Sequence, residues 1–391
     1  MARSFYVADV TVFDGTRIRR RAGVLVTGDR IAWVGAHARA PREVLTARAI
    51  DGAGKTLTPG LIDCHVHLNF DGGADFAAEA AGMDVARASI KGTVNLRRHL
   101  AAGVTAVRDL GGVGTCALAS AVQERIVPGP RVVASGRALT ITGGHGHNIG
   151  IAREIDGADD ARKAVREQIK AGAGAIKVIA TGGVLTPDVP ATFTAMTPEE
   201  IGAAVHEAHS WGRGVAAHAI GAAGILGAVR AGVDSVEHCN QLTVATAREM
   251  VTRGTFRGST LCAVRGIVDH PEAVPAYAVA KAREVYEDSR RGMRRGIRAG
   301  VRHVVSTDAG TPFNPHGSAG REVGYLVDWG LSPLDAMVAA TANGAELLRL
   351  DEVGHVREGF VADLVLWDAN PVEDPAALAK PRTVWKDGSR V

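Results

Sequence analysis

The spacing of hydrophobic and polar positions differs between the ends of the chain and its middle. In residues 1–57, apolar and polar side chains alternate in short runs that Asp-Gly and Gly-Asp pairs interrupt. Alternation with a period of two predicts strands, and these pairs predict tight turns between them. The same pattern returns near the other end, in "ADLVLWDANP" and "RTVWKDGSRV". We therefore predict a small composite β domain, a β-sandwich, built from residues 1–57 and 354–391.

Residues 58–353 instead alternate short apolar runs with longer segments rich in Ala and Glu. The predicted strands lie, in chain order, in "GLIDCHVHL", "GVTAVRDLGG", "PRVVASGRALT", "AIKVIATGG", "GVAAHAIG", "SVEHCN", "GTFRGSTL" and "RHVVSTDAG". One helical segment opens with Thr197, Pro198 and Glu200, which supply a cap, a first-turn proline and a capping-box acid. Eight strands that alternate with helices predict a TIM-like (β/α)8 barrel over this region.

Composition excludes several classes of protein. Of the 391 residues, 46% are hydrophobic and 22% charged, which is enough apolar material for a large ordered core. A net charge of +3 is too small to indicate binding to nucleic acid or to an anionic membrane. No apolar run approaches the ~20 residues of a membrane helix. Four cysteines, none in a CxxC pair, favour a reduced, cytoplasmic protein.

Polar side chains occur where the predicted strands of the barrel end, which is where such barrels carry their catalytic groups. His65 and His67 close the first strand, and residues two apart on a strand point to the same side. The other strands contribute Lys177, His218, His238 and Asp308. Imidazoles and a carboxylate suit Zn²⁺ or a similar divalent ion. The sequence therefore predicts a metal centre at this end of the barrel.

Lys177 does not fit this set as an ammonium ion, because a metal ion would repel it. A buried lysine loses its proton readily, and the neutral amine can add CO₂ to form a carbamate. The carbamate is anionic and has two oxygens, so it could bridge two metal ions. Two divalent ions carry four positive charges, from which the carbamate, Asp308 and a bridging hydroxide would remove three. The site would keep a small positive charge.

Together these segments resemble the amidohydrolase superfamily, in its binuclear subtype with a carbamylated lysine. The resemblance rests on five motifs in order, "PGLIDCHVH", "AIKVIATGG", "AAHAIG", "VEHCN" and "STDAGTPF", and covers nearly the whole chain. It implies that one metal ion is held by His65, His67 and Asp308, the other by His218 and His238, with carbamylated Lys177 between them. It also implies that a hydroxide bridging the metal ions attacks the substrate, while Asp308 transfers the proton.

Within the superfamily, "TGGHGH", "ATGGVLTP" and "DAGTPFNPHG" look most like the prolidase-like group. Members of that group cleave Xaa-Pro or Xaa-Arg/Lys dipeptides, N-acyl amino acids and some xenobiotic amides such as ochratoxin. The resemblance implies a small amide substrate and a homo-oligomer, since members often form octamers. In "TGGHGH", His145 is our candidate for stabilising the oxyanion or for holding a substrate carboxylate. Arg265, after the seventh predicted strand, is a second candidate for the carboxylate.

Three alternatives remain. A cyclic amide or lactone hydrolase of the imidazolonepropionase type could use the same metal core. A mononuclear deaminase usually needs a Glu shortly after the histidine of the fifth strand, and "HAIG" offers none. A non-catalytic barrel used as a scaffold would be expected to have lost ligands, whereas all six positions are present.

Overall fold

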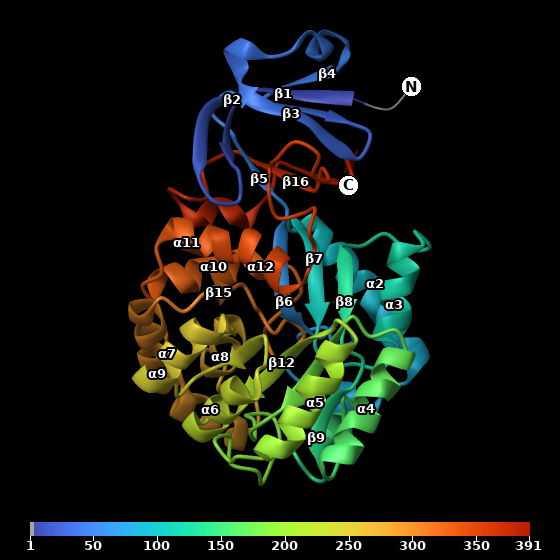
Figure 1. The fold of residues 1–391 in the computed structure, drawn as a ribbon, viewed down its shortest axis with the longest axis vertical. Helices are drawn as coiled ribbons and strands as arrows, with labels where there is room; N and C mark the ends of the chain where they lie inside the picture. The colour runs from blue at the N-terminus through green and yellow to red at the C-terminus, as the bar shows by residue number, and fades with distance from the viewer. Residues whose placement is uncertain (1–3) are drawn as a thin grey trace.

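The computed structural model describes residues 4–391. Strands from both ends of the chain form one sheet at the top of Figure 1, and the middle of the chain forms two parallel sheets below it. The upper sheet contains β1 (Ser4–Phe13), β2 (Ile18–Thr27), β3 (Arg30–Ala36), β4 (Arg48–Asp51), β5 (Thr56–Pro59), β16 (Leu364–Trp367), β17 (Thr383–Lys386) and β18 (Ser389–Arg390).

The β-sandwich stays a prediction for this part of the chain. The upper sheet is continuous in its hydrogen bonding but folds over on itself, because the Phe5 ring on β1 stacks on the Trp385 ring on β17, although β16 and β5 separate these two strands in the sheet. Its order is β18-β17-β16-β5-β1-β2-β3, with β4 paired to β1. The two ends of the chain join because β5 pairs parallel with β1 on one edge and antiparallel with β16 on the other. The predicted domain boundary at residue 57 falls inside β5. Only Gly60 separates β5 from β6, so the upper sheet leads directly into the first parallel strand.

The lower strands all pair in parallel, as the sequence predicts. One sheet contains β6 (Leu61–Val66), β7 (Val104–Asp109) and β8 (Arg131–Ala134). The other contains β9 (Ala138–Ile141), β10 (Ala152–Ile155), β11 (Ala175–Ile179), β12 (Gly214–Ala219), β13 (Ser235–His238), β14 (Phe256–Gly258) and β15 (His303–Val304). The third predicted strand is interrupted and forms β8 and β9.

Backbone hydrogen bonds also link the two parallel sheets at two places, next to β15 and next to β11. The Cys64 N–H donates to the Val305 carbonyl at 2.8 Å, and the Gly174 N–H donates to the Ala134 carbonyl at 2.8 Å. Strands that alternate with helices and meet in this way are consistent with the predicted (β/α)8 barrel.

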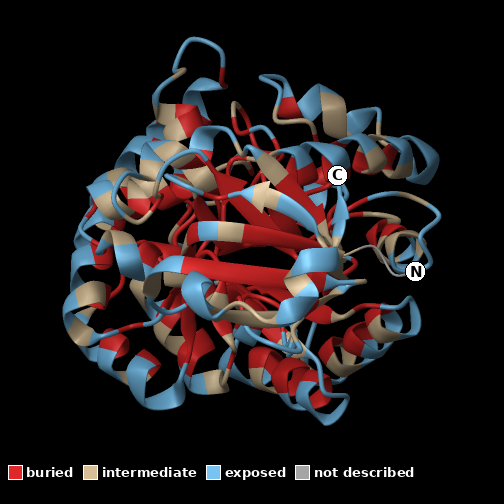
Figure 2. Cartoon of the chain, turned by 90° about the horizontal axis from the view of Figure 1, so that it is seen from above, coloured by how far each residue is buried: buried red, intermediate tan, exposed pale blue. Residues whose placement is uncertain are grey.

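Helices follow most of the parallel strands and lie around them in Figure 1, and Figure 2 shows the buried residues gathered toward the centre of the molecule. They are α1 (Phe76–Ala81), α2 (Val85–Ala101), α3 (Thr115–Gln123), α4 (Ala158–Lys170), α5 (Pro198–Ser210), α6 (Ala222–Ala231), α7 (Val244–Arg253), α8 (Leu261–Val268), α9 (Ala276–Ala299), α10 (Ala319–Asp328), α11 (Pro333–Ala339) and α12 (Ala342–Leu347). The predicted capping box of Thr197 and Glu200 is confirmed at the start of α5. In residues 4–391, no helix is long and apolar enough to cross a membrane.

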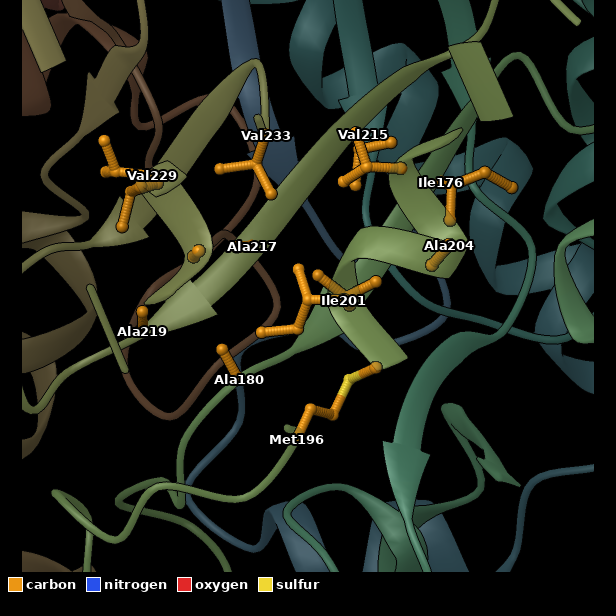
Figure 3. Close-up of a cluster of buried hydrophobic side chains, with 14 of the residues drawn as sticks. Ile176, Ala180, Met196, Ile201, Ala204, Val215, Ala217, Ala219, Val229 and Val233 are labelled. Atoms are coloured by element: carbon orange, nitrogen blue, oxygen red, sulfur yellow. The ribbon is translucent and has the colours of Figure 1, made fainter. Parts of the chain in front are cut away.

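Alternation along the strands separates the hydrophobic core from the candidate site. On β11, Ile176 and Val178 are fully buried in a cluster that also contains Val215 and Ile201 (Figure 3). Burying each such side chain stabilises the fold by about 1.5–3 kcal/mol. Lys177 lies between these two residues in the sequence, so its side chain points to the other side of the sheet, into the cavity described next.

Candidate metal centre

All six side chains predicted to bind metal line one cavity at the carboxyl ends of the parallel strands. They are His65 on β6, His67 just after it, Lys177 on β11, His218 on β12, His238 on β13 and Asp308 in the segment after β15. Five of them are buried, and His238 is half-buried. The structure therefore brings together every residue that the strand-end pattern selected.

His65, His67 and Asp308 form the tightest group. The Oδ1 atom of Asp308 lies 3.3 Å from Nε2 of His65 and 3.1 Å from Nε2 of His67. The other ring nitrogen of each histidine faces an acceptor: Nδ1 of His65 is 3.2 Å from the Glu237 carboxylate, and Nδ1 of His67 is 3.0 Å from the Gly111 carbonyl. These acceptors place the ring protons on Nδ1, so the neutral rings turn their Nε2 lone pairs toward Asp308.

This arrangement fits a bound cation. Two lone pairs and a carboxylate oxygen face one another in a buried space, and the Asp308 Oδ1 atom has no hydrogen-bond donor among the described residues. Such a group is repulsive unless a positive ion lies between its members. Ligands about 2 Å from a tetrahedral Zn²⁺ are separated by about 3.3 Å. The distances from Asp308 Oδ1 to the two histidine nitrogens, 3.3 and 3.1 Å, are close to this value.

His218 and His238 form a second pair, with ring centroids 4.4 Å apart. Nε2 of His218 is 2.7 Å from the Gly182 carbonyl, and Nδ1 of His238 is 2.8 Å from the Thr260 hydroxyl. Each ring therefore keeps one nitrogen free for a ligand. Burial lowers the pKa of both rings well below the ordinary value, which keeps them neutral and able to coordinate.

Lys177 lies between the two groups. Its side chain is 3% exposed, and its Nζ atom is 3.5 Å from Nε2 of His65. Burial lowers the pKa of Lys177 to about 8, so a substantial fraction of the amine is neutral near physiological pH. The chemistry that the sequence analysis assigned to Lys177 is therefore available to it.

Asp308 is held in a strained conformation. Its φ is 59°, in the left-handed region, where a residue with a side chain is disfavoured. Its N–H donates to the His65 carbonyl at 2.8 Å, which ties it to the strand that carries two other candidate ligands. The preceding residue, Thr307, donates to the buried Asp63 carboxylate from its N–H at 3.0 Å and from its hydroxyl at 2.6 Å.

His145 enters the cavity from the loop after β9. Its ring centroid is 4.7 Å from that of His218, and its Nδ1 is 2.7 Å from the Thr186 hydroxyl. Burial lowers the pKa of His145 to about 4, so the ring is neutral. Gly183 permits this approach, because a Cβ there would lie 2.4 Å from the His145 ring. Arg265 is not among the cavity-lining residues. It lies on α8 and pairs with Asp269 at 2.9 Å.

Sequence reasoning missed the residues that support His65. Glu237 is completely buried on β13 and contacts His65 with one carboxylate oxygen. Its other oxygen accepts a hydrogen bond from the Arg108 guanidinium at 2.8 Å. An acid one residue before a strand-end histidine, as in "VEHCN", is the signal that could have identified Glu237.

A Glu237→Gln protein is expected to bind metal about 10–100-fold more weakly, because the orientation of His65 depends on this carboxylate. Its melting temperature should also fall, because Arg108 loses its buried counter-charge. Competition with a chromophoric chelator and thermal unfolding measure the two effects. Glu249→Gln, which alters only a pair with Arg230 on the surface, is the control. Unchanged metal affinity in Glu237→Gln would contradict the supporting role.

The remaining wall of the cavity is mostly apolar, although Asn240, Ser259, Thr260 and Thr311 also line it. Six of its larger apolar residues are Phe76, Ile149, Leu185, Ile220, Val264 and Ile267. Among the described residues that line the cavity, Lys177 and Asp308 are the only acidic or basic side chains apart from the histidines. The cavity therefore combines a polar floor of candidate metal ligands with walls that suit an uncharged group.

Known proteins resemble the chain over nearly its whole length. Ochratoxinase from Aspergillus niger is 31% identical over 94% of this chain and 82% of its own. Imidazolonepropionase from Salinispora arenicola is 30% identical over 90% of this chain and 87% of its own. A crystal structure of a Xaa-Pro dipeptidase with methionine bound in its active site superimposes with a TM-score of 0.90 at 28% identity, over 99% of both chains. The amidohydrolase family profile matches residues 56–391. The chain therefore belongs to the amidohydrolase family, as a hydrolase that acts on amide bonds.

Proposed function

We propose that this protein uses two divalent metal ions on a (β/α)8 barrel to hydrolyse the acyclic amide bond of a dipeptide or N-acyl amino acid with uncharged, apolar groups. The observation that carries the proposal is the cavity itself, in which six candidate ligands form the floor and apolar side chains form the walls. Two of the similar proteins support it by name: an ochratoxinase, and a Xaa-Pro dipeptidase whose active site holds the apolar amino acid methionine.

The proposed metal ions are Zn²⁺. His65, His67 and Asp308 would hold one ion, and His218 and His238 the other. When bound, such a pair supplies a water of lowered pKa and polarises the amide carbonyl. Lys177 would contribute to both ions as a carbamate. Its neutral amine adds CO₂, so that a nitrogen–carbon bond forms and one proton leaves to solvent.

Asp308 is proposed to move the proton. Burial acts to raise the pKa of Asp308, but attraction to nearby positive charge outweighs burial and holds the pKa below its ordinary value; a metal ion between Asp308 and the neutral His65 and His67 rings would supply such a charge. The carboxylate is therefore ionised at neutral pH and can accept a proton from the attacking water. It can then deliver that proton to the nitrogen of the leaving amine, which would otherwise depart as an unstable amide anion.

His145 is proposed to bind the substrate oxygen. If the Thr186 hydroxyl donates to Nδ1 of His145, the ring proton lies on Nε2, and a neutral donor is turned toward the cavity. A neutral N–H can stabilise charge that develops on the carbonyl oxygen, or it can hold a substrate carboxylate. Gly183 leaves room for the ring, and the hydrogen bond with Thr186 holds the ring in place.

The test is a substrate panel with the metal-loaded protein. It contains Xaa-Pro, Xaa-Leu, Xaa-Phe, Xaa-Arg and Xaa-Lys dipeptides, N-acyl amino acids and an ochratoxin-type amide, with amine release as the readout. We expect kcat/KM for apolar substrates to exceed that for the Arg and Lys substrates by about 100-fold or more. The positively charged side chains of the Arg and Lys substrates would lie against an apolar wall that has no free carboxylate to pair with them.

A preference for Arg or Lys substrates would contradict the proposed substrate class. The panel also includes lactams and lactones, since imidazolonepropionase is among the similar proteins. Hydrolysis of these cyclic compounds, with no release from any acyclic amide, would replace the proposal with cyclic amide hydrolysis. The control is protein stripped of metal by a chelator, which should release amine from none of the substrates.

A further inference from the structure

A long segment without helix or strand borders the cavity. It joins β11 to α5 over residues 180–197, and we call it the β11–α5 segment. Its base is closed by a β-bridge between Thr181 and Thr194 and by a hydrogen bond from the Gly182 N–H to the Phe193 carbonyl at 2.8 Å. Segments of this length within a compact domain usually serve the site that they border. What holds the tip of the segment therefore bears on the chemistry of the site.

The tip of the segment forms part of the cavity wall. Val184 and Leu185 both line the cavity. Leu185 packs against two hydrophobic clusters, one containing Ile267 of α8 and the other containing Phe76 of α1. Ile267 and Phe76 line the cavity as well. The tip therefore joins two parts of the apolar wall.

Thr186, in the same tip, connects the segment to His145. It is fully buried, and its hydroxyl oxygen accepts a hydrogen bond from the Gly146 N–H at 3.2 Å. The hydroxyl hydrogen has Nδ1 of His145 as its nearer acceptor, at 2.7 Å, since Oδ1 of Asn148 is 3.4 Å away. A hydroxyl that donates to Nδ1 leaves the ring proton on Nε2. The position of Thr186 therefore determines which nitrogen of His145 can donate to the substrate.

Two side chains of α9 hold this tip from outside the cavity. The Lys281 ammonium donates to the Thr186 and Val189 carbonyls, each at 2.6 Å. Tyr277, one turn earlier on α9, donates from its hydroxyl to the Leu185 carbonyl at 3.2 Å. Hydrogen bonds from a charged donor are the stronger kind, so Lys281 contributes most. Neither Lys281 nor Tyr277 lines the cavity, so each can affect the reaction only through the segment that it holds.

We propose that Lys281 is a positioning residue for His145. By holding the Thr186 carbonyl, it fixes the Thr186 hydroxyl, and the hydroxyl fixes the ring and the tautomer of His145. A ring that turns away, or that carries its proton on Nδ1, presents no donor to the substrate oxygen. The inference rests on the proposed function of His145, and it adds a residue of α9 to the groups on which the reaction depends.

Lys281→Met, in the metal-loaded protein, removes the charged donor and keeps a side chain of similar length. Lys281 is half-buried, so water can reach the two carbonyls and the variant should fold. We expect kcat/KM on the best substrate of the panel to fall about 10-fold or more, because a misplaced group loses transition-state stabilisation. The loss should fall on the same parameter, kcat or KM, that His145→Ala changes. Lys163→Met, at an exposed position of α4, should have unchanged kinetics.

A double-mutant cycle separates the positioning of His145 from a general structural role. If Lys281 acts through His145, the protein with both Lys281→Met and His145→Ala should be as active as His145→Ala alone, within about 2-fold. Two losses that multiply would overturn the proposal. A His145→Ala protein with unchanged kinetics would instead contradict the proposed function of His145.

Hydrogen exchange followed by mass spectrometry tests the same coupling without any substrate. In Lys281→Met, the backbone amides of residues 143–150 should exchange about 10-fold faster than in the unaltered protein. Lys281 donates only to the β11–α5 segment, so this change has to pass through Thr186. Faster exchange, with no amine released from any substrate, would overturn the proposed function and leave the positioning of His145 standing. Unchanged exchange, with normal amide hydrolysis, would overturn the role of Lys281 alone.

Discussion

An Asp308→Asn protein is expected to fold normally and to lose about 10³-fold in kcat on its best amide substrate. The amide keeps the size of the carboxylate, and the hydrogen bond that the N–H of residue 308 donates to the His65 carbonyl is unaffected. The amide cannot accept a proton at neutral pH, and it places no negative charge between His65 and His67. Steady-state kinetics with matched metal content would measure the loss, which should fall mainly on kcat.

Asp159→Asn is the control for Asp308→Asn, because Asp159 is fully exposed at the start of α4 and pairs only with Arg162. It should have unchanged kinetics. Metal analysis of Asp308→Asn distinguishes two causes of inactivity, since a protein that has lost only proton transfer keeps both metal ions. An Asp308→Asn protein with more than about a tenth of normal kcat would contradict the proton-transfer role.

Lys177→Ala is expected to lower kcat/KM by at least about 10³-fold, equivalent to about 4 kcal/mol of transition-state stabilisation. The methyl group supplies no bridging oxygens, so His218 and His238 would be left as the only candidate ligands of one ion. Metal analysis should therefore find about one ion per chain where the unaltered protein holds two. Acetate or propionate, small enough to occupy the emptied space, should restore part of the activity.

The pH dependence distinguishes a carbamate from a simple ammonium role for Lys177. Below pH 8 most of the buried amine is in the protonated form, which does not react with CO₂. Above pH 8 most of it is neutral. Reactivation of metal-stripped protein by zinc and bicarbonate should therefore accelerate as pH rises from 7 to 9. Lys170→Ala, at the exposed end of α4, should behave as the unaltered protein. Reactivation at the same rate with and without bicarbonate would contradict the carbamate.

The placement of the candidate ligands could be predicted because it follows from local rules. His65 and His67 share a side because they are two apart on one strand, and parallel strands bring their carboxyl ends together. Lys177 could be assigned to the side of the strand that faces the candidate site, because Ile176 and Val178 point to the other side, into the hydrophobic core. These inferences need only the period of the strands and the order of the elements.

The features that were missed depend on contacts between distant parts of the chain. Glu237 contacts the ring of His65, which lies 172 residues away in the sequence. The order of the strands in the upper sheet could not be predicted, because alternation identifies strands but not their partners, and β5 bonds to strands on both sides. Arg265 follows a predicted strand, yet α8 begins immediately and carries it to an ion pair with Asp269.

Several predictions remain to be tested. They are the division into a β domain (1–57 and 354–391) and a barrel (58–353), the cytoplasmic location, the homo-oligomer or octamer, and the absence of nucleic-acid and membrane partners. Size-exclusion chromatography with light scattering would settle the oligomeric state.

The pairing of β5 with both ends of the chain has a consequence for synthesis on the ribosome. β5 leads through Gly60 into the strand with the first two candidate ligands, yet one of its edges bonds to β16, which is translated some 300 residues later. Until Trp367 has left the ribosome, the edge of β5 is open, and such an edge can pair with other chains. For most of this interval the nascent chain contains His65 and His67 but not yet Asp308. Throughout it, the edge of β5, the strand just before them, is unprotected. Chaperone binding during translation would matter most in that interval.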